Sequence, residues 1–428
     1  MVMPLLAIYA LELGGAPFLA GLAVGGYALM QMLFQYPFGA LSDRFGRRTL
    51  IAVGMLIFAA GSIVCAFATD IYLLIAGRFV QGMGAVSSVI TATIGDLTGE
   101  EKRSKAMALM GGSIAMSFVV ALLVGPAIGG HFGVGSLFAI SAILVIPALL
   151  ILAFKVPTPQ KARPIEPISG SRIRRVLQNR DLVRLNFAMF LHSFVMTSTF
   201  IFIPLTLRGE FGWAMTDFWK IYLPALFCGV GAMGVGAALG EKYNLVKAVM
   251  IGGILLLIAT FGGVAWRHDE SALLVWIVLI FVGINSLEPL MQSSATKFAK
   301  AAERGSALGL FNACQFFGVF VGGMSAGFLY GHFGLGVLAM LLCALCLVWL
   351  ALTTGLNNPI KMGLLAIKRN EIRAEITPAM IENLEGVREC YTLGEADIVY
   401  IRFDPCLTAN EKLSQMLIDY SQRKPNAD

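Results

Sequence analysis

The stretch "RSKAMALMGGSIAMSFVVALLVGPAIGGHFG" at residues 103–133 returns in altered form at residues 304–334, as "RGSALGLFNACQFFGVFVGGMSAGFLYGHFG". The two stretches align without a gap at a constant offset of 201, and both end in GHFG. Pro4 and Pro204 fit a similar offset. We interpret this as two repeated halves of one chain, in preference to chance similarity between glycine-rich segments.

The composition places both halves in a membrane. Apolar residues make up 57% of the chain and charged residues 14%, and the mean hydropathy is +0.77. Soluble domains are nearer to ~45–50% apolar and ~25% charged. A membrane-spanning helix needs ~20 mainly apolar residues. Eleven segments meet this need: 18–41, 49–68, 71–95, 105–130, 134–154, 182–207, 218–239, 245–266, 272–296, 305–330 and 335–356.

The apolar run at residues 1–11 is too short to span. As a helix it would measure ~16 Å, against a hydrocarbon core of ~30 Å. No basic residue precedes it, so it does not resemble a signal peptide. We expect it to be the remainder of a truncated first helix, which would complete a set of twelve. The alternative is a short helix in a thinned bilayer.

Basic residues gather in the loops on one side of the membrane. The loops on the other side hold about three, namely Arg208, Lys220 and Arg267. The positive-inside rule places the first set in the cytoplasm, together with residues 357–428. The net charge of +6 follows this sorting and does not indicate nucleic-acid binding. The basic loops are 39–48, 97–105, 155–180, 240–247 and 297–304.

Polar groups inside the apolar segments are costly and therefore mark candidate functional positions. In "NSLEPLMQ", Asn285, Glu288 and Gln292 lie on one helix face, and Pro289 can kink the helix. A carboxylate there can bind and release a proton when burial shifts its pKa. The alternative is a structural carboxylate bonded to a neighbouring helix.

A cation and a histidine lie in other apolar segments. Arg78, in "GRFVQGMGA", must face a cavity or a partner, unless it is fixed in an ion pair or reaches the membrane surface. His192 is either a titrating residue or a hydrogen-bonded packing residue. Further candidates to line a substrate cavity are Tyr27, Gln31, Gln81, Asn312 and Gln315.

Three motifs resemble those of the major facilitator superfamily. "GALSDRFGRR" at 39–48 resembles its signature between helices 2 and 3, and "GRFVQGMGA" its helix 4 motif. "GPAIGG" at 125–130 resembles the helix 5 motif of its proton-coupled antiporters, mostly drug exporters; by itself it indicates close helix packing through Gly125, Pro126, Gly129 and Gly130. The stretches "YALMQMLFQYPFGALSDRFGRR", "GDLTGEEKRSKAM" and "LNFAMFLHSFVMTSTF" resemble most the YajR-type group, which carries a cytoplasmic domain after helix 12. The resemblance covers nearly the whole chain.

The resemblance implies a gate latch in the first basic loop. Gly39 would let helix 2 approach helix 11, and Asp43 would lie at the N-terminus of helix 11, where the helix dipole favours an anion. Arg47 would reach a carboxylate at the end of helix 4. Such contacts would clamp the two halves together on the cytoplasmic side while the cavity opens outward. The alternative is that the arginines only set topology and touch lipid phosphates. The latch residues are Gly39, Asp43, Arg47, Asp96 and Arg304.

The composition changes after residue 357. Strand-like segments are "GLLAIKRNEI", "VRECYTL" and "DIVYIRF", and helix-like segments are "TPAMIENLEG" and "TANEKLSQMLIDY". Their β-α-β-β-α order predicts a small ferredoxin-like α+β domain, either regulatory, dimerising or passive. The expected division is 1–155 for the N-terminal half, 156–180 for a cytoplasmic linker, 181–357 for the C-terminal half and 364–424 for this domain.

We therefore predict an all-α, twelve-helix secondary transporter of the bacterial inner membrane that exports a small solute or drug in exchange for protons by alternating access. We assign proton coupling to Glu288 first, with Arg78 and His192. The expected partners are the substrate, protons, lipid and, through the tail, a second copy. No enzyme activity, cofactor or metal is expected. The alternatives are an uptake symporter or uniporter for a sugar or organic acid, and a transporter-like membrane sensor.

Overall fold

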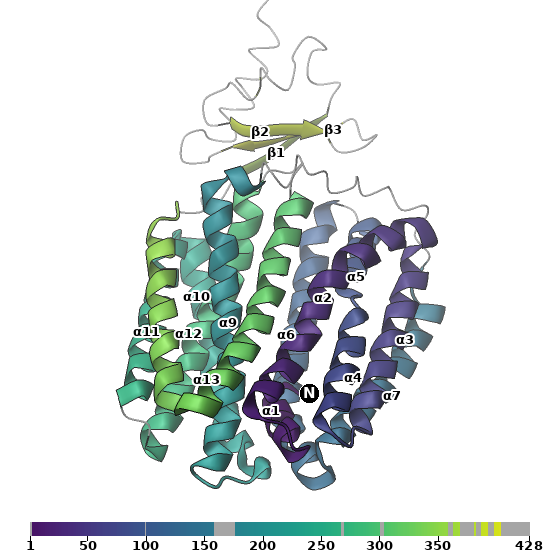
Figure 1. Cartoon of the computed structure of the whole chain (residues 1–428). Helices are drawn as coiled ribbons and strands as arrows, with labels where there is room; N and C mark the ends of the chain where they lie inside the picture. Colours follow the sequence, from purple (N-terminus) through teal and green to yellow (C-terminus); the bar gives the residue numbers. More distant parts are fainter. Residues whose placement is uncertain are drawn as a thin grey trace, which may run out of the picture.

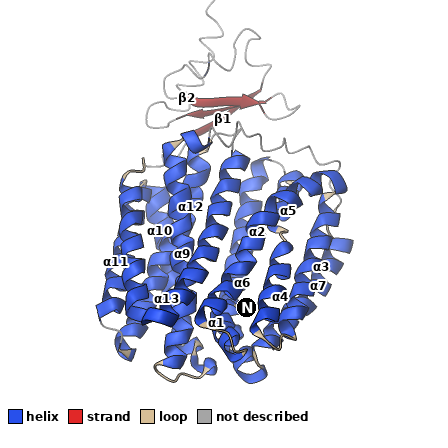
Figure 2. Cartoon of the chain, viewed as in Figure 1, coloured by secondary structure: helices blue, strands red, loops and turns tan. Residues whose placement is uncertain are grey.

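The computed structural model describes residues 2–98, 100–157, 176–266, 269–299, 304–357, 363–368, 381, 387–392 and 398–403. Within them the helices pack side by side in one bundle, and three short strands lie together at one end of it (Figures 1 and 2). We call this end of the bundle the tail end, and the other end the far end. The elements of the two halves lie largely on opposite sides of the bundle (Figure 1).

The helices follow the two halves of the chain. Each of the eleven predicted segments coincides with helical structure. The N-terminal half contains α1 (Met3–Glu12), α2 (Pro17–Phe45), α3 (Arg47–Ala66), α4 (Ile71–Met83), α5 (Ser87–Leu97), α6 (Glu100–Phe132) and α7 (Val134–Phe154). The C-terminal half contains α9 (Arg180–Gly209), the short η1 (Met215–Asp217), α10 (Trp219–Tyr243), α11 (Val246–Trp266), α12 (Glu270–Phe298) and α13 (Arg304–Thr354).

The repeated GHFG sequence produces a sharp change of direction in each half. α13 has 51 residues, and a straight helix of that length would measure about 75 Å, more than twice the hydrocarbon thickness. It is broken at Gly334, where φ is 78°, and so contains two crossings. Gly133, between α6 and α7, has φ 77°. Glycine is favoured at both positions because other residues rarely adopt a positive φ.

The predicted helix over 71–95 is interrupted. α4 ends at Met83 and α5 begins at Ser87, with three non-helical residues between them. Gly84 lies against α3, where an added Cβ would overlap the Gly54 carbonyl oxygen and lie 3.1 Å from the Phe58 nitrogen. The hydrophobic pattern alone does not report this break, because the residues on both sides remain apolar.

The tail contains an antiparallel sheet of β1 (Gly363–Lys368), β2 (Val387–Thr392) and β3 (Ile398–Phe403). β3 is the central strand and pairs antiparallel with both neighbours, so β1 and β2 run in the same direction. This is the strand arrangement of a split β-α-β unit. The two helices expected in the tail lie outside the described residues, apart from Ile381.

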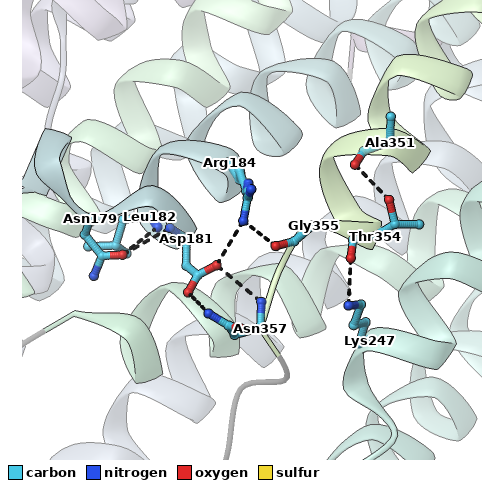
Figure 3. Close-up of polar contacts among 9 residues, drawn as sticks. All are labelled: Asn179, Asp181, Leu182, Arg184, Lys247, Ala351, Thr354, Gly355 and Asn357. Carbon is cyan, nitrogen blue, oxygen red and sulfur yellow. Dashed lines mark hydrogen bonds and ion pairs between the residues drawn. The ribbon is translucent and has the colours of Figure 1, made fainter.

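The chain leading into the tail is fixed to the C-terminal half (Figure 3). The carboxylate of Asp181, on α9, accepts hydrogen bonds from the Asn357 amide nitrogen at 3.2 Å and from its Nδ2 at 2.7 Å. Arg184 of α9 and Lys247 of α11 donate to the last carbonyls at the end of α13. These cations satisfy carbonyls that the helix end leaves free. The start of the tail is therefore held by α9, α11 and α13.

Candidate transport site

Arg78 is a buried cation inside the N-terminal half, with 7% of its surface exposed. Its Nε donates to the Ala23 carbonyl of α2 at 3.1 Å, and its Nη1 donates to Gln81 Oε1. Its guanidinium carbon lies 4.7 Å from the centre of the Tyr27 ring, a cation–π contact. No carboxylate among the described residues pairs with it. The helices thus hold a fixed positive charge among neutral groups.

Two more hydrogen bonds extend this network through the N-terminal half. Gln81 Nε2 donates to Ser62 Oγ of α3 at 2.8 Å, and Gln31 Nε2 donates to the Tyr27 hydroxyl at 3.1 Å. Gln31, Gln81 and Ser62 are all buried. Three predicted cavity residues, Tyr27, Gln31 and Gln81, are therefore brought together with the cation by α2, α3 and α4.

Arg78→Lys is expected to lower the thermal unfolding midpoint of the detergent-solubilised protein. The corresponding loss in the free energy of unfolding is about 1–3 kcal/mol. Lysine keeps the charge but lacks the planar fork that serves Ala23, Gln81 and the tyrosine ring together. Arg44→Lys is the matched control, because Arg44 is exposed at the end of α2. Equal midpoints for the two variants would contradict a structural role of the fork.

His192 lies fully buried between α9, α12 and α13. Its Nε2 is 3.2 Å from the carbonyl oxygen of Ile284, and its ring meets Trp349 edge-on at a centroid distance of 5.8 Å. Because a carbonyl only accepts, this contact assigns the hydrogen of the neutral ring to Nε2. Nδ1 is buried and has no hydrogen-bond partner among the described residues. The imidazole is therefore held through Nε2, and its basic nitrogen Nδ1 is left without a hydrogen bond to these residues.

Glu288 lies on α12 beside this histidine. It follows Ile284 by one helical turn, so the carbonyl that contacts His192 also accepts the helical hydrogen bond of the Glu288 amide. Glu288 and His192 interact electrostatically. The Glu288 side chain is half-buried, and within the described ranges its carboxylate forms no ion pair. Two titratable groups, one on α9 and one on α12, therefore lie near each other across the Ile284 carbonyl.

The remaining predicted cavity residues of the C-terminal half are less closely grouped. The Asn285 amide bonds to a carbonyl one turn back in α12 at 2.8 Å, and Gln292, nearer the tail end, is exposed. Asn312 and Gln315 are half-buried and share one face of α13. Phe317, which is exposed, lies on the opposite face of that helix. The two amides are therefore turned away from the face that carries Phe317.

The predicted contact of Arg47 with Asp96 is present, and Arg47 also contacts Asp43 and Ser42. Its Nε lies 3.0 Å from Asp96 Oδ2 and its Nη1 lies 2.7 Å from Asp43 Oδ1, the latter without the geometry of an aligned hydrogen bond. The same Nη1 donates to Ser42 Oγ at 2.6 Å. Only 3% of Arg47 is exposed. The arginine therefore joins the end of α2, the start of α3 and the end of α5, all within the N-terminal half.

The predicted contacts of this loop with helix 11 are not seen in this conformation. An added Cβ at Gly39 would find its nearest atom at Ser88 Oγ of α5, 3.8 Å away, and not on α13. At Gly305 on α13 it would meet no atom within 4 Å. The side chain of Arg304 lies outside the described residues. Among the described residues, α2 and α13 therefore do not contact each other at Gly39 and Gly305, so the predicted contacts cannot form in this conformation.

At the far end the same two helices touch. An added Cβ at Gly21 of α2 would overlap the Gly323 carbonyl of α13, and one at Gly331 would lie 2.8 Å from Pro17 Cβ. Glycine is needed here because the backbones approach too closely for a side chain. At Gly309, nearer the tail end, there is open space within 4 Å. The two halves are therefore in contact at the far end and separated along α13 toward the tail end.

Gly21→Ala is expected to lower the thermal unfolding midpoint by an amount corresponding to about 1–3 kcal/mol, because the methyl group must push α2 away from α13. Gly231→Ala, on α10, is the matched control, since an added Cβ there meets no atom within 4 Å. An unchanged midpoint for Gly21→Ala would show that α2 and α13 are not in close contact at the far end.

The "GPAIGG" stretch lies in α6, and its last glycine contacts the other half. Gly125 and Pro126 are buried within α6. Gly129 packs on α1, and an added Cβ at Gly130 would lie 2.6 Å from Thr216 Cγ2 of η1, in the other half. The predicted packing role is consistent with these contacts.

Three contacting residues were missed in the sequence. Ser62 was detectable, because it is a lone hydroxyl in the apolar run "AAGSIVCA". Ser42 lies inside the "GALSDRFGRR" motif, but it is uncharged, and the motif was interpreted through its charged residues. Trp349 gave no signal, because a tryptophan in an apolar helix is unremarkable until folding places it against His192.

The chain matches known transporters in sequence and in fold. The sequence profile described as "Major Facilitator Superfamily" matches residues 1–287. "Inner membrane transport protein YajR" of Escherichia coli (strain K12) is 33% identical over 97% of this chain and 93% of its own length. "Multidrug resistance protein MdtH" of Aeromonas hydrophila is 26% identical over 83% and 88%. "Quinolone resistance protein NorA" of Staphylococcus aureus (strain Mu50) is 23% identical over 77% and 85%.

The fold is also similar to that of a solved transporter structure. The crystal structure of the human organic anion transporter MFSD10 superposes with a TM-score of 0.58 at 18% identity, covering 78% of this chain and 83% of that one. At this identity the similarity concerns the arrangement of the helices alone.

Proposed function

The chain belongs to the major facilitator superfamily and is a multi-pass secondary transporter, and from this premise we propose that it exports a small solute or drug in exchange for protons. Relatives named for multidrug and quinolone resistance support the substrate class. The relative named as an inner membrane transport protein supports a bacterial inner-membrane location. The basic loops at the tail end support placing that end in the cytoplasm.

The observation that carries proton coupling is the pairing of Glu288 with His192. A carboxylate inside a membrane protein is costly unless it is neutralised, and the ring beside it has a free basic nitrogen. A proton bound by either group changes the charge of this region between α9 and α12. Such a change can bias the two conformations of the transporter, as coupling requires.

Arg78 has a different proposed role. Arginine stays protonated under all physiological conditions, so it does not itself carry the exchanged proton. Its network with Tyr27, Gln31 and Gln81 fixes one polar wall of the N-terminal half. We assign this wall, together with Asn285, Gln292, Asn312 and Gln315 of the other half, to the substrate.

The conformation fits a transporter that faces inward. The close contacts at Gly21 and Gly331 lie at the far end, and the open positions Gly305 and Gly309 lie toward the tail end. Alternating access requires the reverse arrangement in the other state. In that state Asp43 would meet the start of α13 beside Arg304, and the Arg47–Asp96 ion pair would hold Asp43's loop ready for this contact.

We assign the tail at residues 364–424 to a ferredoxin-like domain that regulates transport or pairs two copies. The β1-β3-β2 order with parallel outer strands is the support for this fold. The contacts of Asp181 with Asn357 tie its leading residues to α9 (Figure 3). The domain would then move with the C-terminal half when the halves rock.

Energised inverted membrane vesicles with a pH-sensitive dye test the proposal. A panel of lipophilic cations, neutral drugs, organic acids and sugars is added in turn. We expect at least one compound to release protons from the acidified lumen, and vesicles without the protein to show no release. Compound-driven proton movement in the opposite sense would favour a symporter, and silence across the panel with correctly inserted protein would favour a sensor.

A further inference from the structure

An ion pair connects the two halves at the far end. Arg208 Nη1 at the end of α9 lies 2.6 Å from Glu12 Oε1 at the end of α1. The other ion pairs of the described residues lie within one half, at Arg47, Arg184 and Lys220. Of the pairs in the described ranges, this one alone therefore joins groups that alternating access must separate.

The pair lies beside the contacts that join the two halves at the far end. Glu12 is five residues before Pro17, which packs on Gly331 of the other half. Arg208 precedes η1, whose Thr216 packs on Gly130 of the first half. The two charges can meet only while these surfaces are together. When the halves part at the far end, both side chains return to solvent.

We propose that Glu12 and Arg208 form a far-end latch that stabilises the conformation closed at that end. It would act in opposition to the tail-end loop of Asp43 and Arg47, so that each end has its own charged restraint. Both side chains are partly exposed, at 39% and 42%. Exposed ion pairs are weak, so losing this one is expected to change the ratio of the two conformers by about two- to fivefold. The latch needs only that the halves rock, whatever the exchanged solutes are.

Distances between spin labels test the latch in the full-length chain after replacement of the native cysteines. Labels at Phe67 and Trp266, exposed by 77% and 92%, report the far end. Labels at Phe154 and Tyr243 report the tail end. Each pair places one label on either half, so opening at one end lengthens its distance.

Glu12→Gln and Arg208→Gln are each expected to raise the population with a long far-end distance by about two- to fivefold and to lower the long tail-end population. The exchanged pair Glu12→Arg with Arg208→Glu is expected to restore both distributions. Lys220→Gln is the matched control, because it removes an exposed ion pair at the same end but within one half.

Single variants with unchanged distributions would overturn the latch. So would an exchanged pair that fails to restore them, because the effect would then come from the individual side chains. A control variant that shifts the distributions as strongly as Glu12→Gln would reduce the effect to surface charge and would also overturn it. A shift that is restored by the exchange supports the latch even if no proton movement is detected in vesicles.

Discussion

Replacing Glu288 by glutamine is expected to abolish substrate-driven proton release, with a loss of at least about tenfold in initial rate. Glutamine has nearly the same shape but does not bind and release a proton, so the site on α9 and α12 loses its change of charge. Dye recovery in energised inverted vesicles measures the rate. Equal amounts of inserted protein must be confirmed for each variant.

Glu270→Gln is the matched control for this experiment. It is the same chemical change on the same helix, at the far end of α12, where Glu270 accepts a hydrogen bond from Trp213. The control is expected to keep exchange near the wild-type rate. Glu288→Gln with undiminished exchange would remove this residue from the coupling mechanism, and His192→Gln would then become the next variant to measure.

Replacing Arg47 by alanine is expected to have the largest effect on stability. The cation is almost fully buried between Asp43 and Asp96, whose side chains are 20% and 26% exposed. Removing it leaves two carboxylates facing each other and leaves Ser42 without its donor. A loss of about 2–4 kcal/mol is expected, somewhat below that of a fully buried pair because water reaches the carboxylates.

Thermal unfolding in detergent, together with the yield of folded protein, measures this loss. Arg48→Ala is the control, since Arg48 is the next residue and donates one hydrogen bond, to the Ala153 carbonyl. The change in its unfolding midpoint is expected to correspond to no more than about 0.5 kcal/mol in the free energy of unfolding. Equal midpoints for the two variants would show that the arginines of the loop set topology without stabilising it.

The membrane-spanning segments could be predicted because their signal is local. Twenty apolar residues must become a helix in lipid, where every backbone group needs a partner within the segment. The Arg47–Asp96 contact could also be predicted, because the resemblance of "GALSDRFGRR" to the family's signature implies it. The last glycine of GHFG is required by its positive φ at Gly133 and Gly334.

The contacts that depend on how helices pack could not be predicted. Trp349 is 157 positions from His192 in the chain, and Arg208 is far from Glu12; neither pair has a motif that links its members. The interruption between α4 and α5 lies where Gly84 packs against α3, a contact between distant residues that the hydrophobic pattern does not record. The separation of Gly39 from α13 depends on which conformation is adopted, and one sequence encodes both.

Exchange requires that substrate and protons cross the membrane in opposite directions. Purified protein in liposomes with a trapped pH-sensitive dye tests this most directly, using a compound identified in the vesicle panel. When the compound is driven inward by its own gradient, protons are predicted to leave, so the lumen becomes more alkaline, and Glu288→Gln liposomes show no change. Acidification of the lumen as the compound enters, or compound entry without proton movement, would contradict exchange of substrate for protons.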